Sequence, residues 1–174
     1  MTAADFKRLF LPQAETMHKT AWHLTGNVQE AEDLVQEVFL TLWTKRDNLE
    51  VGSNVTEYCL ATVRNIYINT LRRKGKLDIS PSPVENDTGH PSLATDDLMD
   101  SLIKRDAAER MLALIHRLPE AQRIIVTLRD VEGLPYDEIA AATNLSEGNI
   151  RVLLSRARKQ LREQFKLLEN YEHA

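Results

Sequence analysis

Apolar residues along this chain recur at spacings of three and four, and no stretch alternates apolar and polar residues as a half-buried strand does. The clearest repeat lies in residues 28–46, where it forms one apolar stripe on a helix. The stripe consists of Val28, Ala31, Leu34, Val35, Val38, Phe39, Leu42 and Trp43. Gly26-Asn27 is a typical end for a preceding helix, which we expect over residues 5–25 with a break at Pro12. The pattern predicts an all-α fold.

Helical periodicity returns after a polar turn at residues 48–54. A helix is predicted over residues 55–74, with an inner face formed by Val55, Tyr58, Cys59, Thr62, Ile66, Tyr67 and Leu71. Four more helices are predicted over residues 98–118, 119–132, 136–143 and 147–168, the second of them opened by Pro119 and ended by Gly133.

Residues 78–100 differ from the rest of the chain in composition. They contain six acidic residues, three prolines and no Lys or Arg. Such a stretch lacks the apolar area that would offset its ordering entropy, so we interpret it as an extended linker. We therefore predict two small helical domains, residues 1–77 and 98–174, joined by an acidic linker at residues 78–97.

Residues 134–161 have the spacing of a helix-turn-helix motif. Asn144 tolerates the left-handed backbone that such a turn needs, and Ser146 is a good N-cap for the second helix. That helix has an apolar side, and residues 151–166 carry six basic side chains and one acid. A major-groove helix needs basic flanks for phosphates and short polar groups for base edges. We interpret the motif as DNA-binding; the alternative is a solvated cationic face on a structural helix.

The formal net charge of −4, from 22 Lys and Arg against 26 Asp and Glu, argues mildly against a nucleic-acid binder. However, the average conceals unlike segments, since residues 58–77 hold five basic side chains and no acid. The single cysteine, Cys59, excludes an intrachain disulfide and favours a reducing compartment. Apolar runs are too short for a membrane span, and the first ten residues lack a signal-peptide core. We expect a cytoplasmic protein with no direct membrane insertion.

Three segments in chain order carry a family resemblance. They are EAEDLVQEVFLTLW at residues 30–43, VRNIYINTLRRK at residues 63–74, and YDEIAAATNLSEGNIRVLLSRAR at residues 136–158. Together they resemble the extracytoplasmic-function (ECF) sigma factors of bacterial RNA polymerase, members of the sigma-70 family. The resemblance covers nearly the whole chain, and it implies region two at residues 1–77 and the region four helix-turn-helix at residues 98–174.

The resemblance also implies site residues. The positions that match the polymerase-binding face are Asp33, Gln36, Glu37 and Leu40. Those that match the segment holding the −10 promoter element are Asn48, Tyr58, Arg64, Asn65, Asn69, Arg72 and Arg73. For the −35 element we expect contacts from Ser146, Asn149, Arg151, Ser155, Arg156, Lys159 and Arg162. The family pattern has Trp-Leu-Tyr where this chain has Tyr58-Cys59-Leu60, so the promoter sequence does not follow from the resemblance.

The partners that the resemblance implies are core RNA polymerase, through its β′ clamp helices and β flap, promoter DNA, and an anti-sigma factor that is often membrane-anchored. The function implied is promoter-specific initiation of transcription, with no catalytic residue, metal or cofactor in this chain. The acidic linker would lie in the polymerase cleft that otherwise holds RNA.

Two other classes of protein remain open at this point. A stand-alone helix-turn-helix regulator would bind duplex DNA without polymerase, but it leaves the segment at residues 30–43 unexplained. A nucleic-acid-processing enzyme would need a convergent acidic or metal cluster. None of the five histidines lies three or four positions from another, and the sequence has no phosphate-binding glycine loop.

Overall fold

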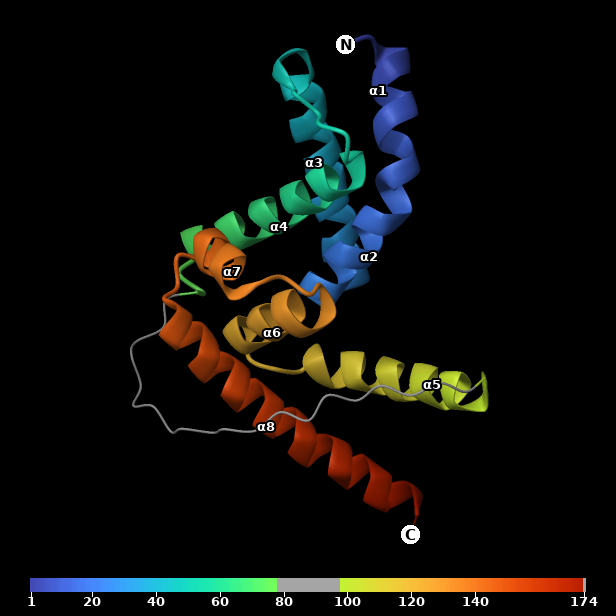
Figure 1. Cartoon of the computed structure of the whole chain (residues 1–174), viewed down its shortest axis with the longest axis vertical. Helices are drawn as coiled ribbons and strands as arrows, with labels where there is room; N and C mark the ends of the chain where they lie inside the picture. The colour runs from blue at the N-terminus through green and yellow to red at the C-terminus, as the bar shows by residue number, and fades with distance from the viewer. Residues whose placement is uncertain (78–97, 174) are drawn as a thin grey trace. The chain divides into compact units, whose positions relative to one another are not determined.

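The computed structural model of the chain describes residues 1–77 and 98–173. These residues form helices and short connections, and none of them is in a β-strand, which confirms the all-α class. They belong to two compact units. In Figure 1 the colour follows the chain from blue at the N-terminus to red at the C-terminus. The predicted linker at residues 78–97 lies outside the described residues.

The first unit contains four α-helices. They are α1 (Ala3–Phe10), α2 (Ala14–Thr25), α3 (Val28–Lys45) and α4 (Val55–Arg73), with 3-10 turns η1 (Leu11–Gln13) and η2 (Arg46–Asn48). The break expected at Pro12 is present, because Pro12 lies in η1 between α1 and α2. The connection between α2 and α3 is as tight as the sequence predicts. Gly26 ends α2 with φ of 68°, and the Asn27 side chain accepts a hydrogen bond from the Glu30 amide at 3.0 Å.

The core of the first unit lies where α2, α3 and α4 pack on one another. Its largest fully buried side chains are Phe10, Met17, Leu24, Val35, Leu42 and Ile68. On α4 the buried set differs from the predicted inner face. Val63 and Ile68 are fully buried, whereas Val55, Tyr58, Thr62 and Ile66 are only half-buried. The buried residues of α4 therefore lie on a face rotated round the helix axis from the predicted one, and this face is set by packing against both α2 and α3.

The second unit contains α5 (Leu98–Ile115), α6 (Glu120–Val126), the π-helical turn η3 (Thr127–Val131) and α8 (Glu147–Glu172). It also contains residues 136–140, the first part of α7 (Tyr136–Thr143). Pro119 is the N-cap of α6 rather than its first residue, and Gly133 follows η3 with φ of 75°. The helix α8 continues four residues beyond the predicted end. No helix among the described residues combines the length and apolar character that a bilayer crossing requires.

The connection between α7 and α8 has the geometry predicted for a helix-turn-helix turn. Asn144 has φ of 60°, and it is the one described non-glycine residue with positive φ. The Ser146 hydroxyl accepts a hydrogen bond from the Asn149 amide at 3.1 Å and so caps α8. The inner side of α8 is buried as predicted, at Ile150, Leu153, Leu154, Ala157 and Leu161. It packs mainly on α6, which contributes Ile124 and Ile125.

Candidate functional site

The outer face of α3 carries the four residues predicted to bind polymerase. Asp33, Gln36, Glu37 and Leu40 are all exposed. Since successive helical residues are about 100° apart, these four lie within an arc of about 100° on the helix surface. We call this set the α3 outer face. It lies opposite the buried stripe, so its residues are available to a partner without disturbing the core.

One member of the α3 outer face is unusual for a water-exposed surface. Leu40 is 66% exposed, Glu37 lies one turn before it on the same face, and Asp33 lies one turn farther. An exposed leucine alone needs no explanation, but one that shares a helix face with two carboxylates has the composition of a mixed apolar and acidic docking surface.

The loop before α4 begins from a packed aromatic cluster. Trp43 contacts Phe6 edge-on, with ring centroids 5.1 Å apart. The Arg46 guanidinium lies 4.1 Å from the Trp43 ring centroid and donates a hydrogen bond to the Trp43 carbonyl at 2.9 Å. This anchoring fixes the start of the loop that contains Asn48, which is exposed.

Several of the residues predicted to hold the −10 element surround one pocket. It has a volume of about 360 Å³ and lies between the end of α3 and the outer side of α4. Tyr58, Asn65 and Asn69 line it, together with Thr41 and Lys45. The pocket therefore offers a half-buried aromatic ring, two exposed amides and a cation to whatever enters it. Two further predicted residues, Arg72 and Arg73, are exposed in the last turn of α4.

Arg64 differs from these residues because it is buried. It is 7% exposed, and its guanidinium donates a hydrogen bond to the Glu57 carboxylate at 2.5 Å. The two residues lie two helical turns apart on α4. A contact between Arg64 and DNA remains a prediction, and in this structure the Arg64 guanidinium is paired with Glu57.

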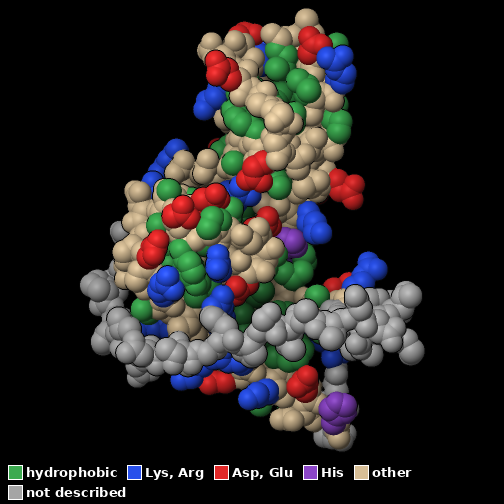
Figure 2. Space-filling view, viewed as in Figure 1, with side chains coloured by type: hydrophobic (Ala, Val, Ile, Leu, Met, Phe, Trp, Pro, Cys, Tyr) green, Lys and Arg blue, Asp and Glu red, His purple; other side chains and the backbone are tan. Residues whose placement is uncertain are grey.

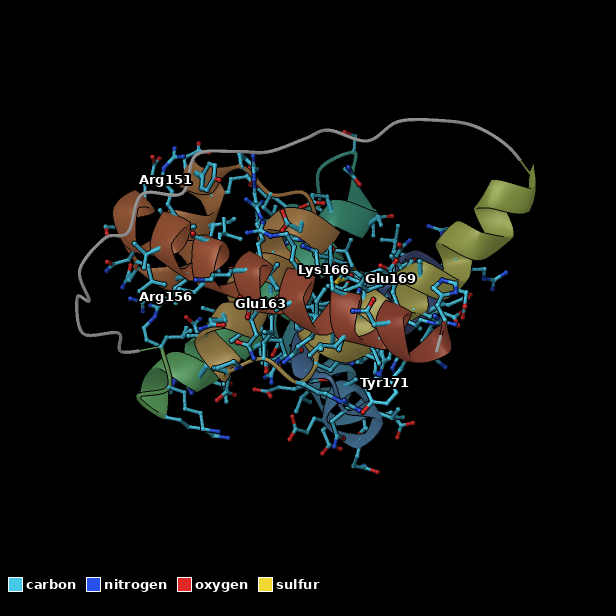
Figure 3. All side chains as sticks on the ribbon, turned by 90° about the horizontal axis from the view of Figure 1, so that it is seen from below. Arg151, Arg156, Glu163, Lys166, Glu169 and Tyr171 are labelled. Carbon is cyan, nitrogen blue, oxygen red and sulfur yellow. The ribbon has the colours of Figure 1, made fainter. Side chains whose placement is uncertain are left out.

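The outer face of α8 presents the bases predicted to contact the −35 element. Arg151, Arg156, Lys159 and Arg162 are exposed, while Asn149 and Ser155 are half-buried between them. Figure 3 shows Arg151 and Arg156 on the N-terminal half of α8, with Lys166, Glu169 and Tyr171 farther along the helix. The exposed Ser146 hydroxyl acts as the N-cap and already accepts one hydrogen bond from the backbone.

Sequence reasoning missed a cluster of side chains beneath this face. The Arg158 guanidinium makes two hydrogen bonds to the Asp130 carboxylate, at 2.9 Å and 2.6 Å. This pairing, helped by Tyr136, raises the pKa of Arg158 above its usual value. The Arg129 and Arg151 guanidinium carbons each lie 4.4 Å from the Tyr136 ring centroid. No local signal could have revealed the cluster, because Asp130 and Arg158 are 28 positions apart.

The described residues do not bring three His, Cys, Asp or Glu side chains together as metal ligands. Cys59 is fully buried, and burial raises the pKa of its thiol to about 11, so it is an unreactive core side chain. On the face that Figure 2 shows, acidic and basic side chains of the described residues are interspersed with one another. The described helix faces differ in chemistry, since the α3 outer face is acidic and apolar whereas the outer face of α8 carries exposed basic side chains.

Two family models match the chain in order. The model for sigma-70 region 2 matches residues 11–77, and the model for sigma-70 region 4 matches residues 108–161. The ECF RNA polymerase sigma factor SigE of Mycolicibacterium smegmatis is 29% identical over 161 residues, which are 91% of this chain and 61% of the relative. The ECF RNA polymerase sigma factor SigW of Bacillus subtilis is 23% identical over 157 residues, which are 87% of this chain and 84% of the relative.

A solved structure is also similar. The sigma factor RpoE from Bartonella quintana, crystallised in complex with the anti-sigma factor NepR, matches with a TM-score of 0.56 and 28% sequence identity. The match covers 93% of this chain and 97% of that one. Two helical units with these regions in this order define a sigma-70 type of transcription factor. The chain belongs to the sigma-70 family, in its extracytoplasmic-function group.

Proposed function

We propose that this chain binds core RNA polymerase and directs it to promoters that contain its −35 and −10 elements. In this proposal residues 1–77 bind the polymerase and hold the −10 strand, and residues 98–174 bind the −35 duplex. Residues 78–97 connect the two along the polymerase cleft. RNA synthesis is the chemistry of the polymerase, and this chain acts in the cytoplasm, where the polymerase works.

The observation that carries the proposal is the α3 outer face. A stand-alone helix-turn-helix regulator needs the surface of α8, but it does not need an exposed leucine beside two carboxylates on a separate unit. Polymerase binding uses both features, since Leu40 supplies apolar area while Asp33 and Glu37 attract and orient a basic partner helix.

For the −10 element we propose capture of a single strand. Such capture needs cations along the backbone and a surface on which an unstacked base can rest. Arg72 and Arg73 supply the cations at the end of α4, and the pocket of about 360 Å³ supplies the surface, with Tyr58 for stacking and Asn65 for hydrogen bonds. Asn48, in the loop anchored by Trp43, would contact a neighbouring base.

For the −35 element we propose that α8 enters the major groove. The inner side of α8 is buried in the core, so only its opposite side is available to contact the groove. There Arg151, Arg156, Lys159 and Arg162 would bind phosphates, and Asn149 and Ser155 would contact base edges. We also propose an anti-sigma factor as a partner that masks these surfaces, in line with the complex of the Bartonella quintana sigma factor.

The proposal is tested by adding the purified chain to core polymerase that lacks any sigma factor and sequencing the transcripts made from sheared genomic DNA. We expect discrete start sites that depend on the chain. Binding to core without any discrete start site would contradict promoter recognition. Operator binding by the free chain without core binding would favour the helix-turn-helix regulator.

A second experiment tests the division of labour. Arg156→Ala should weaken binding of the reconstituted holoenzyme to a −35 duplex, and it should lower the slope of log affinity against log salt by about 0.9 if one phosphate contact is lost. Lys166→Ala is the matched control, because Lys166 is an exposed base on the same helix, ten residues farther from its N-terminus. Core binding should be unchanged in both variants; its loss in Arg156→Ala would refute the assignment.

A further inference from the structure

The helix-turn-helix contains one aromatic ring that two arginines share. The guanidinium groups of Arg129 and Arg151 each lie 4.4 Å from the centroid of the Tyr136 ring, within the distance at which a cation and a ring attract. Arg129 comes from η3, Tyr136 is the first residue of α7, and Arg151 lies in the second turn of α8. The ring therefore connects the two helices of the motif with η3, which precedes it in the second unit.

Two of the arginines around the ring are held in place by other groups. The half-buried Arg129 donates a hydrogen bond to the Leu134 carbonyl at 2.9 Å. Arg158 is held by two hydrogen bonds to the Asp130 carboxylate. These hydrogen bonds hold the Arg129 and Arg158 side chains in fixed positions near the ring.

Arg151 is the member of the cluster that extends into solvent. Its side chain is 60% exposed. Its ion pair with Glu147 is 3.9 Å long, and because both groups are exposed, that pair contributes little to holding the side chain. The contact with the Tyr136 ring is therefore what sets the orientation of the Arg151 side chain over the surface of α8.

The electrostatics of the cluster favour an anionic ligand. Arg129 and Arg151 contact the Tyr136 ring, and Arg158 interacts with the same tyrosine. Asp130 neutralises Arg158, and Glu147 pairs with Arg151 only through a long, exposed contact. The negative face of the ring offsets part of the repulsion among these arginines. A phosphate beside Arg151 would offset the remaining repulsion among the guanidinium groups. The Arg151 guanidinium already lies at the exposed edge of the cluster.

We propose that Tyr136 is a positioning residue for −35 recognition, because its ring holds the Arg151 guanidinium where it meets the DNA backbone. Arginine has a large rotamer entropy, which is lost when the side chain is fixed on DNA. Because the ring already restricts the Arg151 side chain in the free chain, less entropy remains to be lost when DNA binds. This inference rests on the proposed function, since it assumes that the outer face of α8 binds the −35 duplex.

The test is a double-mutant cycle on the reconstituted holoenzyme. The probe is a −35 duplex from a promoter that the chain transcribes with core polymerase, and the reference is a scrambled duplex of equal length. Tyr136→Leu should weaken specific binding about 2- to 13-fold, the cost of ordering one arginine side chain that the ring no longer holds. In an Arg151→Ala background the same change should have no further effect, and Tyr136→Phe should bind like the wild type because the ring is kept.

Equal losses from Tyr136→Leu in both backgrounds would overturn the inference, since they would mean that the tyrosine acts through the fold and not through Arg151. Tyr171→Leu is the matched control, because Tyr171 is 83% exposed on α8 and lies outside the cluster. A wild-type holoenzyme that binds both duplexes equally would instead refute −35 recognition itself, which belongs to the proposed function.

A second pair of variants covers the outcome in which Tyr136→Leu unfolds the domain. Phenylalanine and pentafluorophenylalanine at position 136 have nearly the same shape, but fluorination removes the negative ring face that attracts a cation. We expect the fluorinated chain to bind the −35 duplex several-fold more weakly, and only when Arg151 is present. Equal affinities for the two chains would overturn the inference.

Discussion

Leu40→Asp is predicted to separate polymerase binding from folding. Leu40 is 66% exposed and makes no contribution to the core of the first unit. A substitution there should change the free energy of unfolding by less than about 0.5 kcal/mol. Its effect on a partner that covers the α3 outer face should be much larger, because that partner meets a carboxylate where it would have met an apolar side chain.

The size of the effect follows from the exposed fraction. Full burial of a leucine side chain is worth about 1.5–3 kcal/mol. Since 66% of Leu40 remains exposed in the free chain, an interface can gain about 1–2 kcal/mol from it. Leu40→Ala should therefore weaken core binding roughly five- to thirty-fold, and Leu40→Asp should weaken it more, because an unpaired carboxylate must also be desolvated.

The assay is competition between each variant and a fluorescently labelled wild-type chain for a fixed amount of core polymerase. Val28→Asp is a matched control, because Val28 is 65% exposed on the same helix and lies about 120° round the axis from Leu40. It should compete as well as the wild type. If Leu40→Asp also competes normally while unfolding at the wild-type temperature, polymerase does not bind the α3 outer face. Equal losses in both variants would mean that any new charge on α3 interferes.

Three further predictions concern the stability of the chain and are checked by urea unfolding. Asp130→Asn should lower the free energy of unfolding by about 1–2 kcal/mol, because it breaks the doubly hydrogen-bonded and partly buried ion pair with Arg158. Glu147→Gln breaks only the exposed pair with Arg151 and should change the free energy of unfolding by less than about 0.5 kcal/mol. Equal effects of the two substitutions would contradict the structure. Asn144→Ala should cost about 1–2 kcal/mol at φ of 60°, and Asn144→Gly should cost little; an alanine that is tolerated as well as glycine would refute the turn geometry. Burial raises the pKa of Cys59 from 9.0 to about 11, so the unfolded chain loses the thiol proton at lower pH than the folded chain. Stability should therefore decline between about pH 9 and pH 11, and Cys59→Ala should show a smaller decline; identical pH profiles would argue against the shift.

The features that could be predicted from the sequence are those with a local cause. The repeat at residues 28–46 corresponds to α3 (Val28–Lys45). Both signals that predict this helix, the apolar spacing and the Gly26-Asn27 boundary, depend only on residues close together in the sequence. The turn at Asn144 and the cap at Ser146 were predicted for the same reason, since each depends on the backbone of its immediate neighbours. The exposure of the α3 outer face follows from the same periodicity.

The features that escaped prediction depend on packing between distant segments. Helical spacing alone gives α4 a single inner stripe, but its contact with two other helices buries Ile68 as well. The same packing buries Arg64, which sequence alone presents as one more base in a cationic helix, and Glu57 is the acid that makes this burial tolerable. Arg129, Arg151 and Arg158 meet at Tyr136 only after the chain has turned back between η3 and α8.

The two sides of α8 have a consequence for how such proteins diverge. Ile150, Leu154 and Ala157 hold the helix in place and are fully occupied in doing so, whereas Asn149 and Ser155 contribute little to the core. If α8 binds the −35 duplex as proposed, mutations on the outward side would change which promoter is bound while the domain still folds, whereas mutations on the inward side would destabilise the domain whatever promoter is bound. A gene duplication can in this way produce a factor for a new set of genes by a few substitutions on one helix surface, while the scaffold that presents them is inherited intact.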